Sequence, residues 1–239
     1  MQSNRPSILC TGPIDESILR MQEYKAADID VIPFTQINTT LTETIEKQVK
    51  EILSKTAIVV FTSGNAIKSV AGYLKDKQPD WTIYCIGNTT YDLAKKYFDA
   101  ENIKQTAFNA RTLAEMIIPE INKDEVIFFC GNLRRNDLTD TLRQKGIAVK
   151  EIIVYQTSLI PVTIEKEYDA ILFFSPSAAE SFFSKNTLSA KTVLFVIGNT
   201  TASSVKKYSN NKIIAGDEPD KNKLISKAIL YVHENSIHH

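Results

Sequence analysis

The sequence predicts an α/β protein of two parallel-sheet domains that are related by an internal duplication and joined by a two-stranded hinge. The segment IYCIGNTTYDLAKKY at 83–97 returns at 194–208 as LFVIGNTTASSVKKY, with 8 of 15 positions identical. A second matched pair, FTSGNAIKSV at 61–70 and FFSPSAAESF at 173–182, precedes the two copies at nearly the same spacing. Each element is an apolar run, a short Gly/Ser/Thr/Asn turn and a helical pattern, so two strand–turn–helix units have been duplicated together.

The other segments also alternate between apolar strand-like runs and amphipathic helical patterns, which is typical of a parallel sheet covered on both faces. Pro33 interrupts the second run and indicates an edge strand or a place where the chain leaves one sheet. Thr40 and Glu43 have the spacing of a capping box, and Gly146 is a typical helix end. Strands are predicted at 6–12, 29–37, 56–63, 81–88, 103–108, 125–132, 148–161, 168–175, 192–199 and 211–216. Helices are predicted at 14–26, 40–55, 65–74, 90–98, 113–121, 135–145 and 221–234, and after the strands at 168–175 and 192–199.

The long extended run at 148–161 predicts a crossing from one domain to the other. The residues after it supply fewer strands than a complete unit needs, and the two N-terminal strands can make up the difference. We therefore expect a discontinuous domain of residues 1–36 with 157–239 and an inserted domain of residues 37–156. The two extended crossings form the predicted hinge.

Composition predicts a soluble globular protein without a general attraction to polyanions. The 239 residues hold 28 Lys+Arg and 28 Asp+Glu. This balance favours neither nucleic acid nor an anionic membrane as a partner, and any anionic ligand must be held locally. No apolar run approaches the roughly 20 residues that span a bilayer, and the N-terminus lacks a secretory signal. We expect a cytoplasmic protein, and a monomer because no apolar interface stripe is evident.

The cysteines and histidines argue against metal, disulfide and imidazole chemistry. The cysteines at 10, 85 and 130 end apolar runs without metal-ligand spacing, and they are interpreted as buried small side chains. The histidines all lie in the last seven residues, so no Ser–His or Cys–His pair is expected. The GxGxxG and GxxxxGK[ST] motifs of dinucleotide and P-loop sites do not occur. Neither a cofactor nor a metal is predicted.

Four turns that follow predicted strands are candidates for a ligand site. In an open parallel sheet, ligands bind beyond the carboxyl ends of the strands, where helix N-termini direct free N–H groups outward. The turns supply hydroxyl, amide and backbone donors, which suit a ligand with several carboxylates. Ser, Thr and Asn before a helix are also ordinary N-caps, so both roles stay open. The candidate binding residues are Thr62, Ser63, Gly64, Asn65, Asn88, Thr89, Thr90, Ser175, Ser177, Ala178, Asn199, Thr200 and Thr201.

A fifth turn, CGNLRRND at 130–137, carries tandem arginines. Arg134 is a candidate substrate-binding residue because a guanidinium pairs well with a carboxylate. A solvated first helical turn explains Arg134 and Arg135 equally well.

The order and spacing of these motifs resemble the uroporphyrinogen-III synthase family over nearly the whole chain. The resemblance rests on FTSGNAI, CIGNTTYDLAKKY, the CGN run that leads to VYQT, FFSPSAAESF and VIGNTTASSV. It implies two flavodoxin-like domains joined by a two-stranded ladder. It also implies a cofactor-free lyase that cyclises hydroxymethylbilane, a ligand with eight carboxylates, with loss of water and inversion of ring D in haem biosynthesis. A transient hand-over of this substrate from the preceding pathway enzyme fits the same scheme.

Some positions depart from the family's pattern. Thr11, Gly12 and Pro13 follow the first strand, where family members often carry an arginine. Tyr91 stands where a small residue is usual. These departures bear on individual ligand contacts more than on the resemblance to the family.

Tyr155 in VYQT matches a recurrent tyrosine of the family, and the resemblance implies that its phenol donates a proton or a hydrogen bond to the leaving hydroxyl. Taken by itself, an aromatic residue on a strand is more simply a core residue. The same fold also suits a non-catalytic bilobal small-molecule binding or sensor protein, because a fold alone does not fix function.

Overall fold

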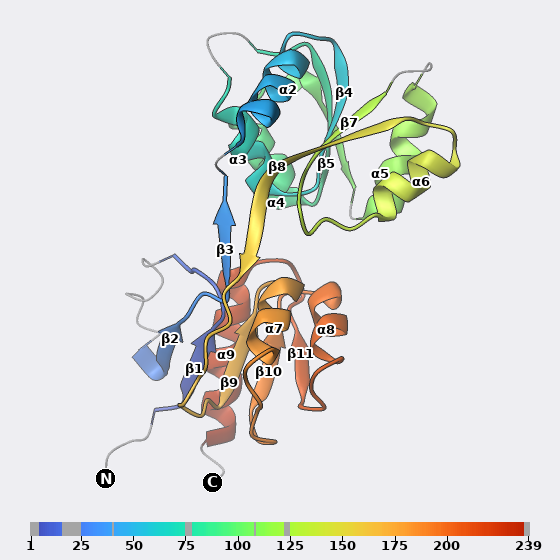
Figure 1. Ribbon diagram of the computed structural model, residues 1–239. Coiled ribbons are helices and arrows are strands. Elements are labelled where there is room, and N and C mark those ends of the chain that lie inside the picture. The colour runs from blue at the N-terminus through green and yellow to red at the C-terminus, as the bar shows by residue number, and fades with distance from the viewer. Residues whose placement is uncertain are drawn as a thin grey trace. The chain divides into compact units, whose positions relative to one another are not determined.

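The structure is a computed structural model that describes residues 5–15, 25–39, 41–74, 78–107, 109–121 and 125–236 (Figure 1). The chain folds into two compact units. Unit 1 consists of Met1–Gln36 and Ser158–His239, and unit 2 consists of Ile37–Thr157. The chain passes between the units inside two strands, β3 (Thr35–Asn38) and β8 (Val149–Leu159), which are neighbours in one sheet.

Unit 1 is a five-stranded parallel sheet with helices on both faces. Its strands are β1 (Ser7–Cys10), β2 (Asp28–Val31), β9 (Ala170–Phe173), β10 (Val193–Val196) and β11 (Ile213–Ala215). They lie in the order β2-β1-β9-β10-β11, which is the flavodoxin-like order 2-1-3-4-5 when counted along the chain. The long helix α9 (Lys221–Ser236) covers one face, and α7 (Pro176–Phe183) and α8 (Asn199–Val205) cover the other (Figure 1).

Unit 2 contains a six-stranded sheet in the order β3-β8-β7-β4-β5-β6. The further strands are β4 (Ala57–Phe61), β5 (Trp81–Ile86), β6 (Ile103–Ala107) and β7 (Val126–Gly131), and the five strands β4 to β8 pair in parallel. The helices are α2 (Glu43–Leu53), α3 (Gly64–Ala71), α4 (Asn88–Ala94), α5 (Ala110–Ile117) and α6 (Asp137–Gln144), with short 3₁₀ turns at Ala100–Asn102 and Ile118–Glu120.

The repeated sequence segments occupy equivalent places in the two sheets. The first segment forms β4 with α3 and β9 with α7, and the second forms β5 with α4 and β10 with α8. In each sheet these two strands lie side by side, and a strand from outside the repeat, β7 or β1, flanks β4 or β9 on the other side. The order β8-β7-β4-β5-β6 thus matches β2-β1-β9-β10-β11, although β7 and β8 follow their repeat along the chain while β1 and β2 precede theirs. This arrangement is consistent with duplication of one α/β unit.

The strands of both units are buried on both faces, as predicted from their continuous apolar runs. In β4, Val59 and Phe61 pack in the cluster that includes residues of α2, α3 and α4, whereas Val60 packs with α5 and α6. In β9, Leu172 packs with α9 and Phe173 packs with α7 and α8. Consecutive residues of one strand therefore contribute to two separate cores.

The structure refines several predicted boundaries. The predicted strand at 29–37 is two strands, β2 and β3, which lie at the edges of different sheets on either side of Pro33, so the interpretation of this proline is confirmed. Thr40 lies outside the described residues, and the cap of α2 is Thr42, whose Oγ1 accepts a hydrogen bond from the backbone N–H of Ile45. Most of the predicted helix at 14–26 also lies outside the described residues. Gly146 has a φ of 77°, as a glycine that ends a helix requires.

Candidate functional site

Each sheet has a point at which the strand order reverses. The loops with Ser63, Arg134 and Ser175 flank these points, and the two GNTT turns follow the next strand outward, β5 or β10. In unit 1 the reversal falls between β1 and β9, and in unit 2 it falls between β7 and β4. Ligands of open α/β sheets bind beyond the carboxyl ends of the strands at such switch points, because the loops on the two sides diverge there. Accordingly, the loops after β4 and β7 in unit 2 and after β1 and β9 in unit 1 define the two candidate sites.

Tyr155 lies at the switch point of unit 2, on the strand next to β7. The pairing of β7 with β8 is regular up to Cys130 opposite Ile153, and then shifts so that Gly131 lies opposite Tyr155. Val154 is the extra residue on β8 at this irregularity. Val154 and Tyr155 consequently pack against the same core cluster, although successive residues of a regular strand face opposite ways. The shift therefore turns the tyrosine toward β4.

The ring of Tyr155 packs directly against the backbone of Gly131. A Cβ atom placed on Gly131 would lie 2.6 Å from Cε2 and 2.7 Å from the phenol oxygen, closer than side-chain carbon atoms approach in proteins. Only glycine leaves this space, since every other residue carries a Cβ. The sequence signal for this contact is a glycine at the end of an otherwise apolar strand, FFCG, and it was missed.

The hydroxyl of Ser63, in the loop after β4, is close enough to the phenol of Tyr155 to influence the pKa of that phenol. Burial raises the pKa of this phenol, and the neighbouring Ser63 hydroxyl lowers the pKa by a smaller amount. The phenol therefore stays protonated at neutral pH, so it is available as a proton or hydrogen-bond donor. The residue as a whole is partly buried.

Asn132 fixes the chain immediately beyond Tyr155. Its side-chain oxygen accepts a hydrogen bond of 2.7 Å from the backbone N–H of Thr157, and its side-chain nitrogen donates one of 3.1 Å to the backbone oxygen of the same residue. The asparagine side chain thus pairs with β8 in the way that another strand residue would. This pair of bonds holds the β7 loop against the end of β8 and limits the movement of Tyr155.

Arg134 points to a protein carboxylate in this structure. Its Nε is paired with Glu151 of β8, and Nη2 of Arg143 lies 2.8 Å from the other oxygen of the same carboxylate. Burial tends to raise the pKa of Glu151, but the hydrogen bonds from the two arginines bring the pKa below its usual range. A ligand carboxylate at Arg134 would therefore share the guanidinium with Glu151. Arg135 is largely exposed and pairs with Asp137 at the start of α6.

The predicted serines of the two equivalent loops are helix caps. Ser63 accepts a hydrogen bond of 3.2 Å from the backbone N–H of Asn65, and Ser175 accepts one of 3.1 Å from that of Ala178. The hydroxyls of Ser175 and Ser177 are also 3.1 Å apart. Capping is thus a role of both serines, and Ser63 additionally contacts the phenol. Of the neighbours in these loops, Thr62, Gly64 and Asn65 are partly buried, and Ala178 is buried.

The two GNTT turns show the same exposure pattern in the two units. Asn88 and Thr89 are exposed and Thr90 is buried; Asn199 and Thr200 are exposed and Thr201 is buried. The buried threonines therefore serve packing, and the exposed pairs are the accessible members of the predicted set. The glycines differ, because Gly87 has a φ of 79° while Gly198 has an extended φ of 177°. Only Gly87 depends on the conformational freedom of glycine.

In the loop after β1, the polar side chain of Thr11 is bonded to another part of the protein. Thr11 is fully buried, and its hydroxyl donates a hydrogen bond of 2.7 Å to the backbone oxygen of Leu172. A residue in this position cannot replace an arginine as an anion ligand. The cationic group near this loop comes instead from Lys221 of α9, a residue that the sequence motifs did not single out.

The structure also places the cysteines. Cys10, Cys85 and Cys130 are free and buried, as predicted, and burial raises the pKa of each thiol to about 12. Within the described ranges, no three His, Cys, Asp or Glu side chains come together as a metal site. No helix in the described part of the chain is long and apolar enough to cross a bilayer.

Comparison with known proteins relates the whole fold to one family. Residues 20–226 match the family model described as uroporphyrinogen-III synthase HemD. The uroporphyrinogen-III synthase of Saccharomyces cerevisiae is 26% identical over 181 residues, which are 63% of this chain and 64% of the yeast protein. The chain thus matches somewhat less than two thirds of the length of this relative.

Solved structures agree in fold. The crystal structure of uroporphyrinogen-III synthetase from Helicobacter pylori has a TM-score of 0.65 at 19% identity, covering 95% of this chain and 99% of that chain. A crystal structure of a mutant uroporphyrinogen III synthase from Thermus thermophilus has a TM-score of 0.68 at 13% identity, covering 98% and 99%. At such identities the likeness concerns the fold, and the match of the family model decides the relationship. The chain belongs to the uroporphyrinogen-III synthase family.

Proposed function

We propose that this protein is a uroporphyrinogen-III synthase, a lyase that converts hydroxymethylbilane to uroporphyrinogen III with inversion of ring D and loss of water. Membership of the family supports the enzyme over a non-catalytic binding or sensor protein. The structural observation that carries the proposal is the phenol of Tyr155, held against Gly131 and next to Ser63 at the switch point of unit 2. A protonated donor in that position fits a reaction that begins with departure of a hydroxyl group.

In the proposed reaction, Tyr155 assists the first bond cleavage. The bond between the hydroxymethyl carbon and its oxygen breaks, the pyrrole nitrogen supplies electrons, and the phenol proton goes to the leaving oxygen to give water. The resulting azafulvene carbon is attacked by the substituted position of the last pyrrole, which forms a spiro intermediate. That intermediate breaks and recloses with ring D inverted, and the proton released at closure restores the phenol.

The other candidate residues are proposed to control the conformation of the substrate. The substrate supplies its own leaving group and its own nucleophilic carbon, so the protein needs to fold the chain and exclude direct closure. Backbone N–H groups and the exposed polar residues of the loops suit its eight carboxylates. The proposed binding residues are Thr62, Ser63, Gly64, Asn65, Asn88, Thr89, Arg134, Ser175, Ser177 and Asn199, with Thr200, while Thr90, Ala178 and Thr201 shape the loops from beneath. We further propose a cytoplasmic monomer that receives its substrate by transient hand-over from the preceding enzyme.

An isomer assay tests this function directly. Freshly prepared hydroxymethylbilane is incubated with the full-length protein, the products are oxidised to uroporphyrins, and the type I and type III isomers are separated by chromatography. Spontaneous closure gives type I, so an excess of type III that grows with protein concentration is the expected result. Heat-denatured protein is the control. Type I product alone, at a rate equal to that of the control, would rule out synthase activity.

A further inference from the structure

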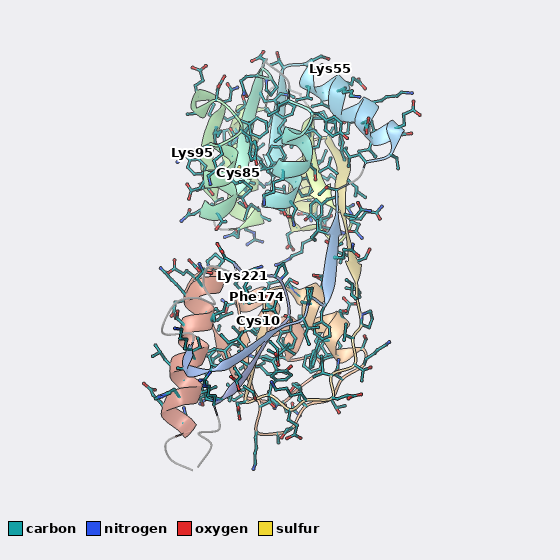
Figure 2. The ribbon with its side chains drawn as sticks, turned by 90° about the vertical axis from the view of Figure 1, so that its left-hand side faces the viewer. Cys10, Lys55, Cys85, Lys95, Phe174 and Lys221 are labelled. Atoms are coloured by element: carbon teal, nitrogen blue, oxygen red, sulfur yellow. The ribbon has the colours of Figure 1, made fainter. Side chains whose placement is uncertain are left out.

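The switch point of unit 1 holds a half-buried ammonium group, that of Lys221. Nζ of this lysine donates a hydrogen bond of 2.7 Å to the backbone oxygen of Pro13 in the loop after β1. It also lies 4.9 Å from the centre of the Phe174 ring, at the end of β9. Figure 2 shows Lys221, Phe174 and Cys10 gathered at the same end of the unit. The first residue of α9 thus reaches both strands between which the order of the sheet reverses.

The acidic residues next to Lys221 in sequence are engaged with other groups. Asp217 pairs with Lys227 at 3.0 Å, and Glu218 pairs with Lys223. The carboxylate of Asp220 caps α9, accepting hydrogen bonds from the backbone N–H groups at 222 and 223 at 2.7 and 3.1 Å. Among the described residues, no carboxylate lies within ion-pair distance of Lys221.

The other neighbours do not neutralise the charge either. Burial raises the pKa of the Cys10 thiol to about 12, so this sulfur is uncharged at neutral pH. Burial lowers the pKa of Lys221, as expected when an ammonium group loses water without gaining an anion. An ammonium has three N–H donors, and the bond to Pro13 uses one of them. The ammonium group of Lys221 therefore stays charged without an anionic partner. The Pro13 carbonyl oxygen and the face of the Phe174 ring offset only part of the cost of its burial.

We propose that Lys221 binds a carboxylate of the tetrapyrrole, and that residues 11–15 after β1, Phe174 after β9 and the side chain of Lys221 form a carboxylate subsite of unit 1. The inference rests on the proposed function, which supplies a ligand with eight such groups. Lys221 supplies at this switch point the positive charge that Thr11, with its buried hydroxyl, does not. The opposing explanation is purely structural, in which Lys221 only ties α9 to the loop at Pro13.

Three variants of the full-length protein separate the two explanations. Lys221→Met keeps an unbranched side chain against Phe174 and removes the charge, and Lys221→Arg keeps the charge. Lys223→Met is the matched control, because Lys223 lies on the same helix and pairs with the exposed Glu218. For each protein, KM is measured with hydroxymethylbilane, Kd is measured by fluorescence anisotropy with uroporphyrin III as the octacarboxylate probe, and Tm is measured by circular dichroism.

The subsite predicts that Lys221→Met raises Kd and KM by about tenfold or more, as loss of a charged hydrogen bond does. The Kd and KM of Lys221→Arg should stay within a few-fold of the wild-type values, and those of Lys223→Met should equal them. Added salt should reduce the difference in Kd between wild type and Lys221→Met. A Lys221→Met protein with a lower Tm but wild-type Kd and KM would overturn the subsite. Lys221 would then have only a structural role, joining α9 to the loop at Pro13. If the wild-type protein forms no type III isomer, the proposed function fails. If the wild-type protein is active but Lys221→Met has the same Kd and KM as the wild type, only this inference is refuted.

Discussion

The phenol ring of Tyr155 occupies the space that a side chain at position 131 would fill, so that Gly131 and Tyr155 act as one structural pair. The two residues lie opposite each other only because the pairing of β7 and β8 shifts by one residue before them. Ser63 completes the arrangement from the loop after the third strand, β4. The position of the proposed proton donor therefore depends on three neighbouring strands of one sheet.

Gly131→Ala should displace the ring of Tyr155. The new Cβ would overlap the ring, and overpacking of this kind costs roughly 1–3 kcal/mol of unfolding free energy. We expect a lower kcat and a larger share of type I product, measured by the isomer assay. Gly72→Ala is the control, because a Cβ there would lie 3.7 Å from its nearest neighbour, the backbone oxygen of Ser69. Adding Tyr155→Leu to Gly131→Ala should restore the lost stability, because the smaller side chain removes the overlap. A wild-type product ratio in the Gly131→Ala protein would contradict the pairing of the two residues.

Tyr155→Phe should preserve the fold and slow the reaction. The ring that packs against Gly131 remains and only the hydroxyl is lost. General acid assistance contributes about 10² to 10⁴ in rate, and we expect the low end of that range or less, since the pyrrole assists departure of the hydroxyl. The expected result is a reduced kcat, a larger fraction of type I isomer and little change in Tm. Wild-type turnover together with a wild-type isomer ratio would return Tyr155 to a packing role.

Ser63→Ala and Ser175→Ala should differ in their coupling to Tyr155. Each removes a helix cap, which costs about 0.5–2 kcal/mol of unfolding free energy. Of these two serines, Ser63 is the one that lies beside the phenol, so its effect on kcat should largely disappear in the Tyr155→Phe background. Any effect of Ser175→Ala should instead add to that of Tyr155→Phe. A double-mutant cycle on kcat measures this coupling, and equal coupling of both serines to Tyr155 would show that the Ser63 hydroxyl does not act on turnover through the phenol.

Glu151→Gln should remove a pH-dependent part of the stability. The pKa of Glu151 is lower in the folded protein than the value of about 4.3 expected in the unfolded chain, because the hydrogen bonds from Arg134 and Arg143 outweigh the effect of burial. Its ionised form therefore stabilises the fold above that pH, and the contribution is lost as the pH falls below it.

Urea unfolding at pH 7, 5, 4 and 3 measures this effect. The free-energy difference between wild type and Glu151→Gln should be largest at pH 7 and shrink toward pH 3. Glu218→Gln is the control, because its exposed ion pair with Lys223 contributes little. A difference that is the same at every pH would mean that ionisation of Glu151 does not contribute.

The sequence predicted most of the fold because the relevant signals are local. Apolar runs identified the strands, turn residues marked their ends, and the repeat predicted a duplication with which the matching strand orders are consistent. Helix starts were predicted less accurately. Ser63 and Ser175 were predicted as possible caps and are caps, whereas the helix predicted to begin at Thr40 is capped by Thr42. A hydroxyl two residues away offers a competing cap, and local sequence alone does not choose between them.

The composition of the site was harder to predict because it depends on strand pairing. The contact between Gly131 and Tyr155 requires the irregular register of β7 and β8. Glu151 meets Arg134 because the chain returns beside β7 after α6, and Lys221 meets Pro13 across 208 residues. The periodicity of apolar residues does not show which distant residues of the chain come into contact. A glycine inside an apolar strand and a single acid within AVKEIIVY were the only local indications.

The shift in β8 makes the geometry of the candidate site depend on the number of residues in the strand as well as on their types. Upstream of Val154 the strand keeps regular pairing and places Glu151 beside the arginines; downstream it presents the opposite set of side chains to the core. Removing the one extra residue would keep every neighbouring amino acid yet reverse which way Tyr155 faces. In this family member, an insertion or deletion in β8 is therefore a far larger change than a conservative substitution there, and the length of this strand should be under stronger selection than the identity of its apolar residues.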